Sequence, residues 1–98
     1  MVKVEVRFFT SLREIVNKRE ETFTFPDNVK VTLDLVLTTL SNKYGKLFTE
    51  YVYDCKTGQP KNFLQFLVNG TSTSTLKGLE TELEDDDVLA VLPPIGGG

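Results

Sequence analysis

One segment of the sequence has the periodicity of an amphipathic helix. This single helix restricts the folds that the chain can adopt. Its apolar residues recur at helical spacing, at Leu33, Val36, Leu37, Leu40 and Tyr44. Thr32 is a suitable N-cap for this helix, and Gly45 is a suitable C-terminal stop. No other segment shows a helical pattern of this strength. Because one helix covers only one face of a sheet, the other face is predicted to lack a helical cover.

Strand signals lie on both sides of this helix. Residues 2–8 and 22–25 alternate apolar and polar side chains, which is the period of a half-buried strand. We expect these two strands to form an antiparallel hairpin, joined by a long polar loop over residues 11–21. After the helix, residues 47–52 are compatible with one short further helical turn.

Two more strands are predicted in the second half of the chain, over residues 63–68 and 88–92. An Asn-Gly turn ends the first of them, and the tract 71–75 is compatible with a short edge strand. Both main strands are apolar at odd and even positions, as strands are when both faces are covered. Either loops or a partner must cover the second face, and a partner is the favoured alternative. Phe9, on the polar side of the first strand, fits such a partner surface.

The composition excludes most chemistry that the chain could carry out alone. Its 98 residues suffice for one domain, expected over residues 1–92 with a tail over 93–98. There is no histidine and only one cysteine, Cys55, which excludes His-activated nucleophiles and an all-protein zinc site. The net charge of −3 argues against direct nucleic-acid binding. We expect no membrane span and no signal peptide, and the lone cysteine fits a reducing cytoplasm.

An acidic run precedes the last predicted strand, with six acidic residues between Glu80 and Asp87. A calcium-binding loop would need a central glycine, which this run lacks. The favoured interpretation is a solvated turn. The alternative is an electrostatic contact with a basic partner surface.

The last six residues form a segment of unusual composition. Pro93-Pro94 favours an extended backbone that cannot pair in a sheet, and Gly96-Gly97-Gly98 has no side chains to clash in a narrow site. The α-carboxylate of Gly98 is ionised at neutral pH and can attack ATP at phosphorus to give an acyl-adenylate. We therefore predict three roles: Gly98 as the activated carboxylate, Gly96 and Gly97 as the tail that threads a partner site, and Phe9, Pro93, Pro94 and Ile95 as docking residues. An inert flexible terminus is the alternative.

Several stretches together resemble a known family. They are Phe8-Phe9-Thr10-Ser11-Leu12-Arg13-Glu14, the helix from Thr32 to Tyr44, Leu67-Val68-Asn69-Gly70, and the ending Leu92-Pro93-Pro94-Ile95-Gly96-Gly97-Gly98. They resemble the small subunit of molybdopterin synthase and, more broadly, the ubiquitin-like sulfur carriers and ubiquitin-related modifiers, including archaeal ones. The resemblance implies an α+β fold of the ubiquitin-like β-grasp type. Such a fold has a mixed sheet of four to five strands, with its first and last strands central and parallel and one main helix packed on one face.

The resemblance also implies a mechanism in which partners supply the catalysis. An E1-like enzyme adenylates Gly98 with MgATP, and a sulfur donor converts the adenylate to a thiocarboxylate. The sulfur then serves tRNA thiolation, or the activated carboxyl is joined to lysines of target proteins. The chain itself would have no catalytic residue, no bound cofactor and no metal. One alternative is the small sulfur-carrying subunit of molybdopterin synthase, acting with the large subunit. A second is a non-catalytic β-grasp interaction module.

Two departures from the family pattern matter. The family usually ends in two glycines, so Gly97 would be the reactive residue if Gly98 were trimmed. The family commonly has Asp-Gly-Asp before the last strand, where this chain has Asp85-Asp86-Asp87. Because glycine takes a positive φ easily and aspartate does not, we expect a different turn at this point.

Overall fold

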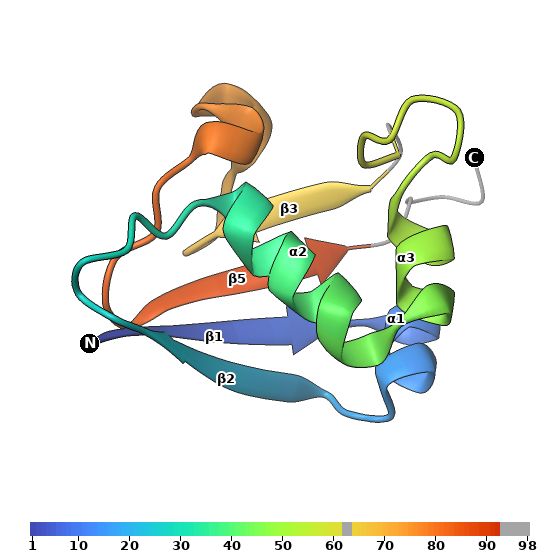
Figure 1. The fold of residues 1–98 in the computed structure, drawn as a ribbon, viewed down its shortest axis with the longest axis horizontal. Coiled ribbons are helices and arrows are strands. Elements are labelled where there is room, and N and C mark those ends of the chain that lie inside the picture. Colours follow the sequence, from blue (N-terminus) through green and yellow to red (C-terminus); the bar gives the residue numbers. More distant parts are fainter. Residues whose placement is uncertain (62–63, 93–98) are drawn as a thin grey trace.

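The computed structural model describes residues 1–61 and 64–92. Its five strands form a mixed sheet in the order β2-β1-β5-β3-β4 (Figure 1). The strands are β1 (Val2–Phe8), β2 (Glu20–Phe25), β3 (Gln65–Val68), β4 (Thr71–Ser72) and β5 (Asp87–Leu92). β1 and β5 are parallel, and the other neighbouring pairs are antiparallel. The structure thus confirms the mixed sheet with central parallel first and last strands, the β1–β2 hairpin and the short edge strand.

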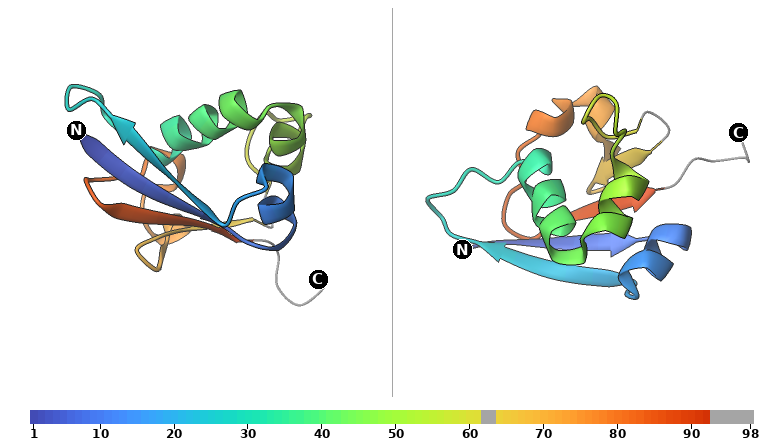
Figure 2. Two further views of the ribbon diagram at one scale, coloured as in Figure 1. Left: turned by 90° about the horizontal axis from the view of Figure 1, so that it is seen from below. Right: turned by 45° about the vertical axis from the view of Figure 1, so that its right-hand side comes forward.

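Helices α2 (Leu33–Tyr44) and α3 (Lys46–Val52) follow each other and pack on one face of the sheet (Figure 2). The predicted caps of α2 are confirmed. The Thr32 hydroxyl oxygen accepts a hydrogen bond from the N–H of Leu35 at 3.1 Å, and the Gly45 N–H donates to the Ser41 carbonyl at 2.8 Å. Gly45 has a φ of 80°, which favours glycine at this position. Helix α3 confirms the short further helical turn.

The segment between β1 and β2 is not the loop that its polar composition predicted. It forms helix α1 (Thr10–Val16), and β2 begins at Glu20. Leu12 and Val16, four residues apart, are buried, and Ile15 packs partly against them. Helix α1 therefore presents a narrow apolar stripe to the core, while Ser11, Arg13 and Glu14 face solvent. The loop prediction was wrong because so narrow a stripe gives only a weak periodic signal.

The connection from β4 to β5 contains two short 3-10 turns, η1 (Thr73–Thr75) and η2 (Gly78–Glu80). Two backbone hydrogen bonds join it to the segment that leads into α2. The Leu33 N–H donates to the Thr81 carbonyl at 2.9 Å, and the Leu83 N–H donates to the Val31 carbonyl at 2.8 Å. The connection is thereby held beside the N-terminal end of α2 (Figure 1).

The core lies between the sheet and the helices. The strands β1 and β5 and the helix α2 contribute Val4, Val6, Phe8, Leu33, Val36, Leu37, Leu40, Leu89 and Val91. Alternate residues of β5 point to the other face, where Ala90 lies between Arg7 of β1 and Leu67 of β3. No helix in the described part of the chain covers that face, as the sequence predicted (Figure 2).

The turn before β5 keeps the backbone conformation for which glycine would be expected. Asp86 has a φ of 69°, in the left-handed region, so the prediction of a different turn is wrong in this respect. The turn is held by aspartate side chains that bind backbone groups. The Lys3 N–H donates to Asp85 Oδ1 at 2.8 Å, and the Glu84 N–H donates to Asp87 Oδ2 at 2.7 Å.

Candidate functional site

The candidate site is the end of the sheet at which β1 and β5 finish, with helix α1 beside it; we call this region the tail end. The two central strands finish together because they are parallel, with Phe8 opposite Val91. Leu92 is the last described residue before the predicted tail. The predicted tail residues Pro93, Pro94, Ile95, Gly96, Gly97 and Gly98 lie outside the described residues, and their roles stay predictions.

Phe9 lies at the tail end, in extended backbone directly before α1. Its side chain is 36% exposed, which is high for a large apolar residue in a fold with a well-packed core. Its carbonyl accepts a hydrogen bond from the Leu12 N–H at 3.2 Å, so the first turn of α1 fixes its position. The structure thus places Phe9 at the surface near the start of the tail, where a docking residue was predicted. Its docking role stays a prediction.

A shallow hollow of about 240 Å³ opens beside Phe9, and sequence reasoning missed it. It is lined by Arg7, Phe8, Phe9, Arg13, Arg19 and Glu20. These three arginines are all the arginines of the chain, and they come from β1, from α1 and from the turn before β2. Their regular spacing in the sequence was the available signal. This spacing brings the arginines together only when the segment between β1 and β2 folds back as a helix.

The three arginines differ in their partners. Arg7 Nε donates to Glu5 Oε2 at 2.6 Å and lies 3.8 Å from the carboxylate of Glu20. The hydrogen bond to Glu5 raises the pKa of Arg7. Arg13 and Arg19 are exposed, and among the described residues neither has an ion pair or a side-chain hydrogen bond. Two of the three positive charges are therefore not compensated by a contacting carboxylate.

Glu21 joins β2 to the C-terminal end of α2, close to the tail end. Its carboxylate is 10% exposed and accepts hydrogen bonds from Lys18 at 2.8 Å, from Lys43 and from Tyr44. Burial alone would raise the pKa of Glu21, but the three hydrogen bonds outweigh it and lower the pKa to about 2. Burial and the neighbouring Glu21 charge raise the pKa of Tyr44. Because these groups satisfy one another, we interpret the cluster as a structural cross-link between the sheet and α2.

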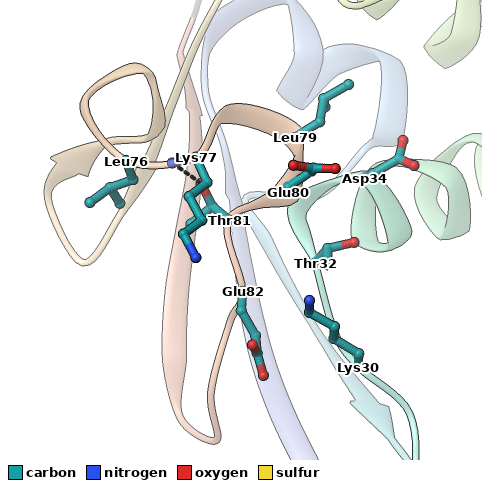
Figure 3. Close-up of a pocket in the computed structure, with 9 residues that line it drawn as sticks. All are labelled: Lys30, Thr32, Asp34, Leu76, Lys77, Leu79, Glu80, Thr81 and Glu82. Carbon is teal, nitrogen blue, oxygen red and sulfur yellow. Dashed lines mark hydrogen bonds between the residues drawn. The ribbon is translucent and has the colours of Figure 1, made fainter.

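A larger hollow, of about 940 Å³, lies at the opposite end of the sheet, between the start of α2 and the connection that contains η2 (Figure 3). It is lined by Lys30, Thr32, Asp34, Leu76, Lys77, Leu79, Glu80, Thr81 and Glu82. Charges of both signs are spread along its walls and do not converge on one point (Figure 3). Within residues 1–61 and 64–92, no three His, Cys, Asp or Glu residues are placed to hold a metal ion. The tail end is therefore the better candidate site.

Comparison with known protein families shows the family to which the chain belongs. Residues 6–98 match the model of the ThiS family, a span that includes the tail end and the tail. The chain belongs to the ThiS family.

The chain is similar in sequence and fold to several named proteins. Small archaeal modifier protein 3 of Haloferax volcanii is 32% identical over 97 residues, which cover 99% of this chain and 100% of that protein. The solution structure of small archaeal modifier protein 1 from Methanosarcina acetivorans has a TM-score of 0.82 at 29% identity, covering 100% of this chain and 98% of that chain. A chain of the Amycolatopsis orientalis BexX/CysO complex has a TM-score of 0.72 at 22% identity, covering 97% of this chain and 99% of that chain, which shows a likeness of fold alone. This ThiS-family chain is therefore a ubiquitin-like sulfur carrier or modifier with a β-grasp fold.

The ThiS-family chain carries few reactive side chains. It has no histidine, and its one cysteine, Cys55, is exposed after α3. In the part of the chain that the structure describes, no helix has the length and apolar character needed to cross a membrane. The site is thus characterised by its surface, formed by Phe9 and the three arginines, and by the tail that begins near it.

Proposed function

We propose that this carrier is activated at the carboxylate of Gly98 by an E1-like enzyme that uses MgATP. A carboxylate oxygen attacks the α-phosphorus of ATP, pyrophosphate leaves, and an acyl-adenylate forms. A sulfur nucleophile then displaces AMP to give a thiocarboxylate, which supplies sulfur for tRNA thiolation. Alternatively, the amine of a target-protein lysine takes the acyl group, loses a proton and forms an amide. In this proposal the chain binds no cofactor of its own, and MgATP belongs to the enzyme.

The position of β5 is the observation that carries this proposal. β5 lies between β1 and β3 at the centre of the sheet, and its Leu89 and Val91 side chains are fully buried. The glycine tail therefore follows a strand that is firmly anchored at the centre of the sheet. An extended segment of six residues reaches about 20 Å beyond Leu92. This length is sufficient for Gly98 to enter a site in another protein while the folded domain stays outside it.

The uncovered face of the sheet is consistent with a partner that binds the domain near the tail. Leu67, Ala90 and Leu92 are only half-buried on that face, although they belong to central or nearly central strands. Phe9 adds an exposed aromatic side chain at the tail end. Apolar groups of this kind are buried when a partner docks, and their burial would contribute to the affinity.

Intact mass spectrometry tests the proposal directly. The carrier is incubated with its cognate E1-like enzyme, MgATP and sodium sulfide, and the C-terminal peptide is then fragmented. We expect the mass change of one oxygen replaced by sulfur, located at Gly98. If the enzyme modifies another carrier in parallel but leaves this one unchanged, the proposal is wrong.

Two truncated variants serve as controls for this experiment. The variant without Gly97 and Gly98 should stay unmodified, with an unchanged melting temperature, because terminal tails contribute little to a folded core. The variant without Gly98 alone tests whether Gly97 can be the reactive residue. Its modification would show that the third glycine is dispensable.

Experiments in cells test which reaction consumes the activated carboxyl group. Loss of thiolated tRNA in a deletion strain would support sulfur transfer, and conjugates linked through lysine would support protein modification. Stable copurification with a large catalytic subunit would instead support the molybdopterin synthase alternative. The similarity to two archaeal modifier proteins supports the first two uses.

A further inference from the structure

The distribution of arginine in the chain is uneven in space. The eleven basic residues include only three arginines, and all three line the hollow at the tail end. Arginine differs from lysine in its planar group of donors, which can bind both oxygens of a carboxylate at once. A cluster made only of arginine is therefore better suited to binding carboxylates or phosphates than to general solubility.

The fold holds this cluster in place without neutralising it. Helix α1 is anchored by the buried Leu12 and Val16, which fixes the backbone that carries Arg13. The Arg19 carbonyl accepts a hydrogen bond from the Phe8 N–H at 2.8 Å, which fixes Arg19 against β1. Arg7 is compensated by Glu5, whereas Arg13 and Arg19 have no such contact within the described ranges 1–61 and 64–92.

The opposite end of the sheet carries the opposite charge. Six of the fourteen acidic residues lie in the segment 80–87, directly before and at the start of β5. We call this segment, with the adjoining starts of β1 and α2, the acidic end. A strand of six residues spans about 17 Å, so the two ends are separated by more than a Debye length of about 10 Å at 0.1 M salt. A partner that receives the tail therefore meets a locally positive surface, although the net charge of the chain is −3.

We propose that Arg13 and Arg19, with the exposed side chain of Phe9 beside them, form a docking site for an acidic protein surface. This surface belongs to the activating enzyme and surrounds the entrance through which the tail passes. The inference rests on the function proposed above and adds the chemistry of the partner to it. Carboxylates of the partner would form bidentate pairs with the two guanidinium groups, and an apolar contact would cover Phe9.

The geometry favours carboxylates at the entrance over the phosphates of ATP. A fully extended tail of six residues would reach up to about 20 Å beyond Leu92, so ATP bound at Gly98 would then lie well away from the arginines. RNA is also disfavoured, because a nucleic-acid surface needs a broad basic face and this hollow is small within an acidic protein. An acidic rim on a protein partner matches both the size and the position of the cluster.

Steady-state kinetics of adenylation test the docking site. The cognate enzyme is assayed for AMP-forming activation with the wild-type carrier, with the double variant R13E/R19E, and with a matched control, K30E/K77E. Both variants change the net charge equally, but Lys30 and Lys77 are exposed at the acidic end. We expect R13E/R19E to raise the KM for the carrier about tenfold, with kcat within about twofold of wild type, because rim charges act mainly on encounter and docking. The control should change KM less than about twofold. R13K/R19K keeps both charges but loses the forked donors, so its KM should lie between those of wild type and R13E/R19E.

The salt dependence of KM provides a second readout of the docking site. The KM of the wild-type carrier should rise with salt concentration more steeply than that of R13E/R19E. Equal KM values for R13E/R19E and the control would overturn the proposal, as would a fall in kcat with unchanged KM. If KM is unaffected but the arginines are needed for tRNA binding, the cluster serves another partner and the proposal is wrong. The same holds if the arginines are needed for self-association in sedimentation. If the enzyme does not activate even the wild-type carrier, the function proposed above fails instead. Melting curves should match between variants, because Arg13 and Arg19 are exposed.

Discussion

The tail end and the acidic end of the sheet use their charged side chains in opposite ways. At the acidic end, Asp85 and Asp87 accept hydrogen bonds from backbone N–H groups, and Asp86 lies 3.4 Å from Lys3 Nζ. At the tail end, Arg13 and Arg19 have no ionic partner in the part of the chain that the structure describes. The three aspartates of the run are thus occupied at the turn, whereas the two arginines remain available. A dense run of charge in a sequence is therefore a poorer guide to a binding surface than the partners of each charge.

The two ends also differ in what holds them together. Helix α1 at the tail end is fixed by the buried side chains of Leu12 and Val16, and its Arg13 side chain stays exposed. The acidic end also buries Val31, Leu33 and Leu83, and it is fixed in addition by hydrogen bonds, including those between the start of α2 and the segment before β5. Burial of a large side chain contributes more to stability than a single hydrogen bond. Substitutions should therefore have larger effects at the buried side chains of α1 than at the hydrogen-bonding side chains of the acidic end, and this difference can be measured.

Replacement of Leu12 by alanine should cause the largest loss. Leu12 is 2% exposed, and removing its side chain leaves a cavity between α1 and the core. We expect the free energy of unfolding to fall by about 2–4 kcal/mol. Urea unfolding followed by circular dichroism measures this loss. The control is Leu76→Ala, at a side chain that is 48% exposed on the connection leading to the acidic end, with an expected change below about 0.5 kcal/mol. Equal losses would contradict the idea that packing holds the tail end.

Replacement of Glu21 by glutamine tests a strong charge contribution near the tail end. The pKa of Glu21 is lowered from 4.5 to about 2, so the folded state favours the ionised form. Its contribution is present above pH 4.5 and is lost as the pH falls towards 2. We expect Glu21→Gln to lose about 2 kcal/mol at pH 7, and the difference from wild type to shrink between pH 4.5 and pH 2. Urea unfolding across this range measures both. Glu14→Gln, at an exposed position in α1, is the control, and a difference for Glu21→Gln that does not vary with pH would rule out this electrostatic account.

The sequence was sufficient to predict those parts of the molecule that depend on local signals. The strands follow from alternation, and α2 follows from its caps and from the spacing of Leu33, Val36, Leu37 and Leu40. Helix α1 was missed because its stability comes from packing Leu12 and Val16 on a core that local sequence does not reveal. The arginine hollow was missed for the same reason, since it exists only when α1 brings Arg13 towards Arg7. The chemistry of the tail could be predicted because glycine, proline and a carboxylate act through backbone properties alone.

Replacement of Thr32 by alanine tests the hydrogen bonds that hold the acidic end. The Thr32 hydroxyl oxygen accepts a hydrogen bond from the Leu35 N–H at 3.1 Å, which caps the first turn of α2. Without this acceptor, we expect a loss of about 1 kcal/mol in the free energy of unfolding. Thr32→Ser keeps the oxygen and should lose less than half of that amount. If serine and alanine destabilise equally, the methyl contacts of Thr32 matter more than its cap.

Replacement of Asp86 by glycine should have the smallest effect and the opposite sign. Asp86 has a φ of 69°, a conformation that costs an L-residue about 1–2 kcal/mol and glycine almost nothing. Part of this gain is offset because glycine is more flexible in the unfolded chain and because the exposed ion pair with Lys3 is lost. We expect a net gain of about 0.5 kcal/mol, measured by urea unfolding at low and high salt. Asp86→Ala loses the same ion pair but keeps the positive φ, so it should be less stable than wild type. Equal stability of Asp86→Gly and Asp86→Ala would show that the positive φ carries no strain at this position. If Asp86→Gly is more stable than Asp86→Ala but less stable than wild type, the charge of Asp86 outweighs its backbone strain, and ion pairs contribute more to the acidic end than its exposed position implies.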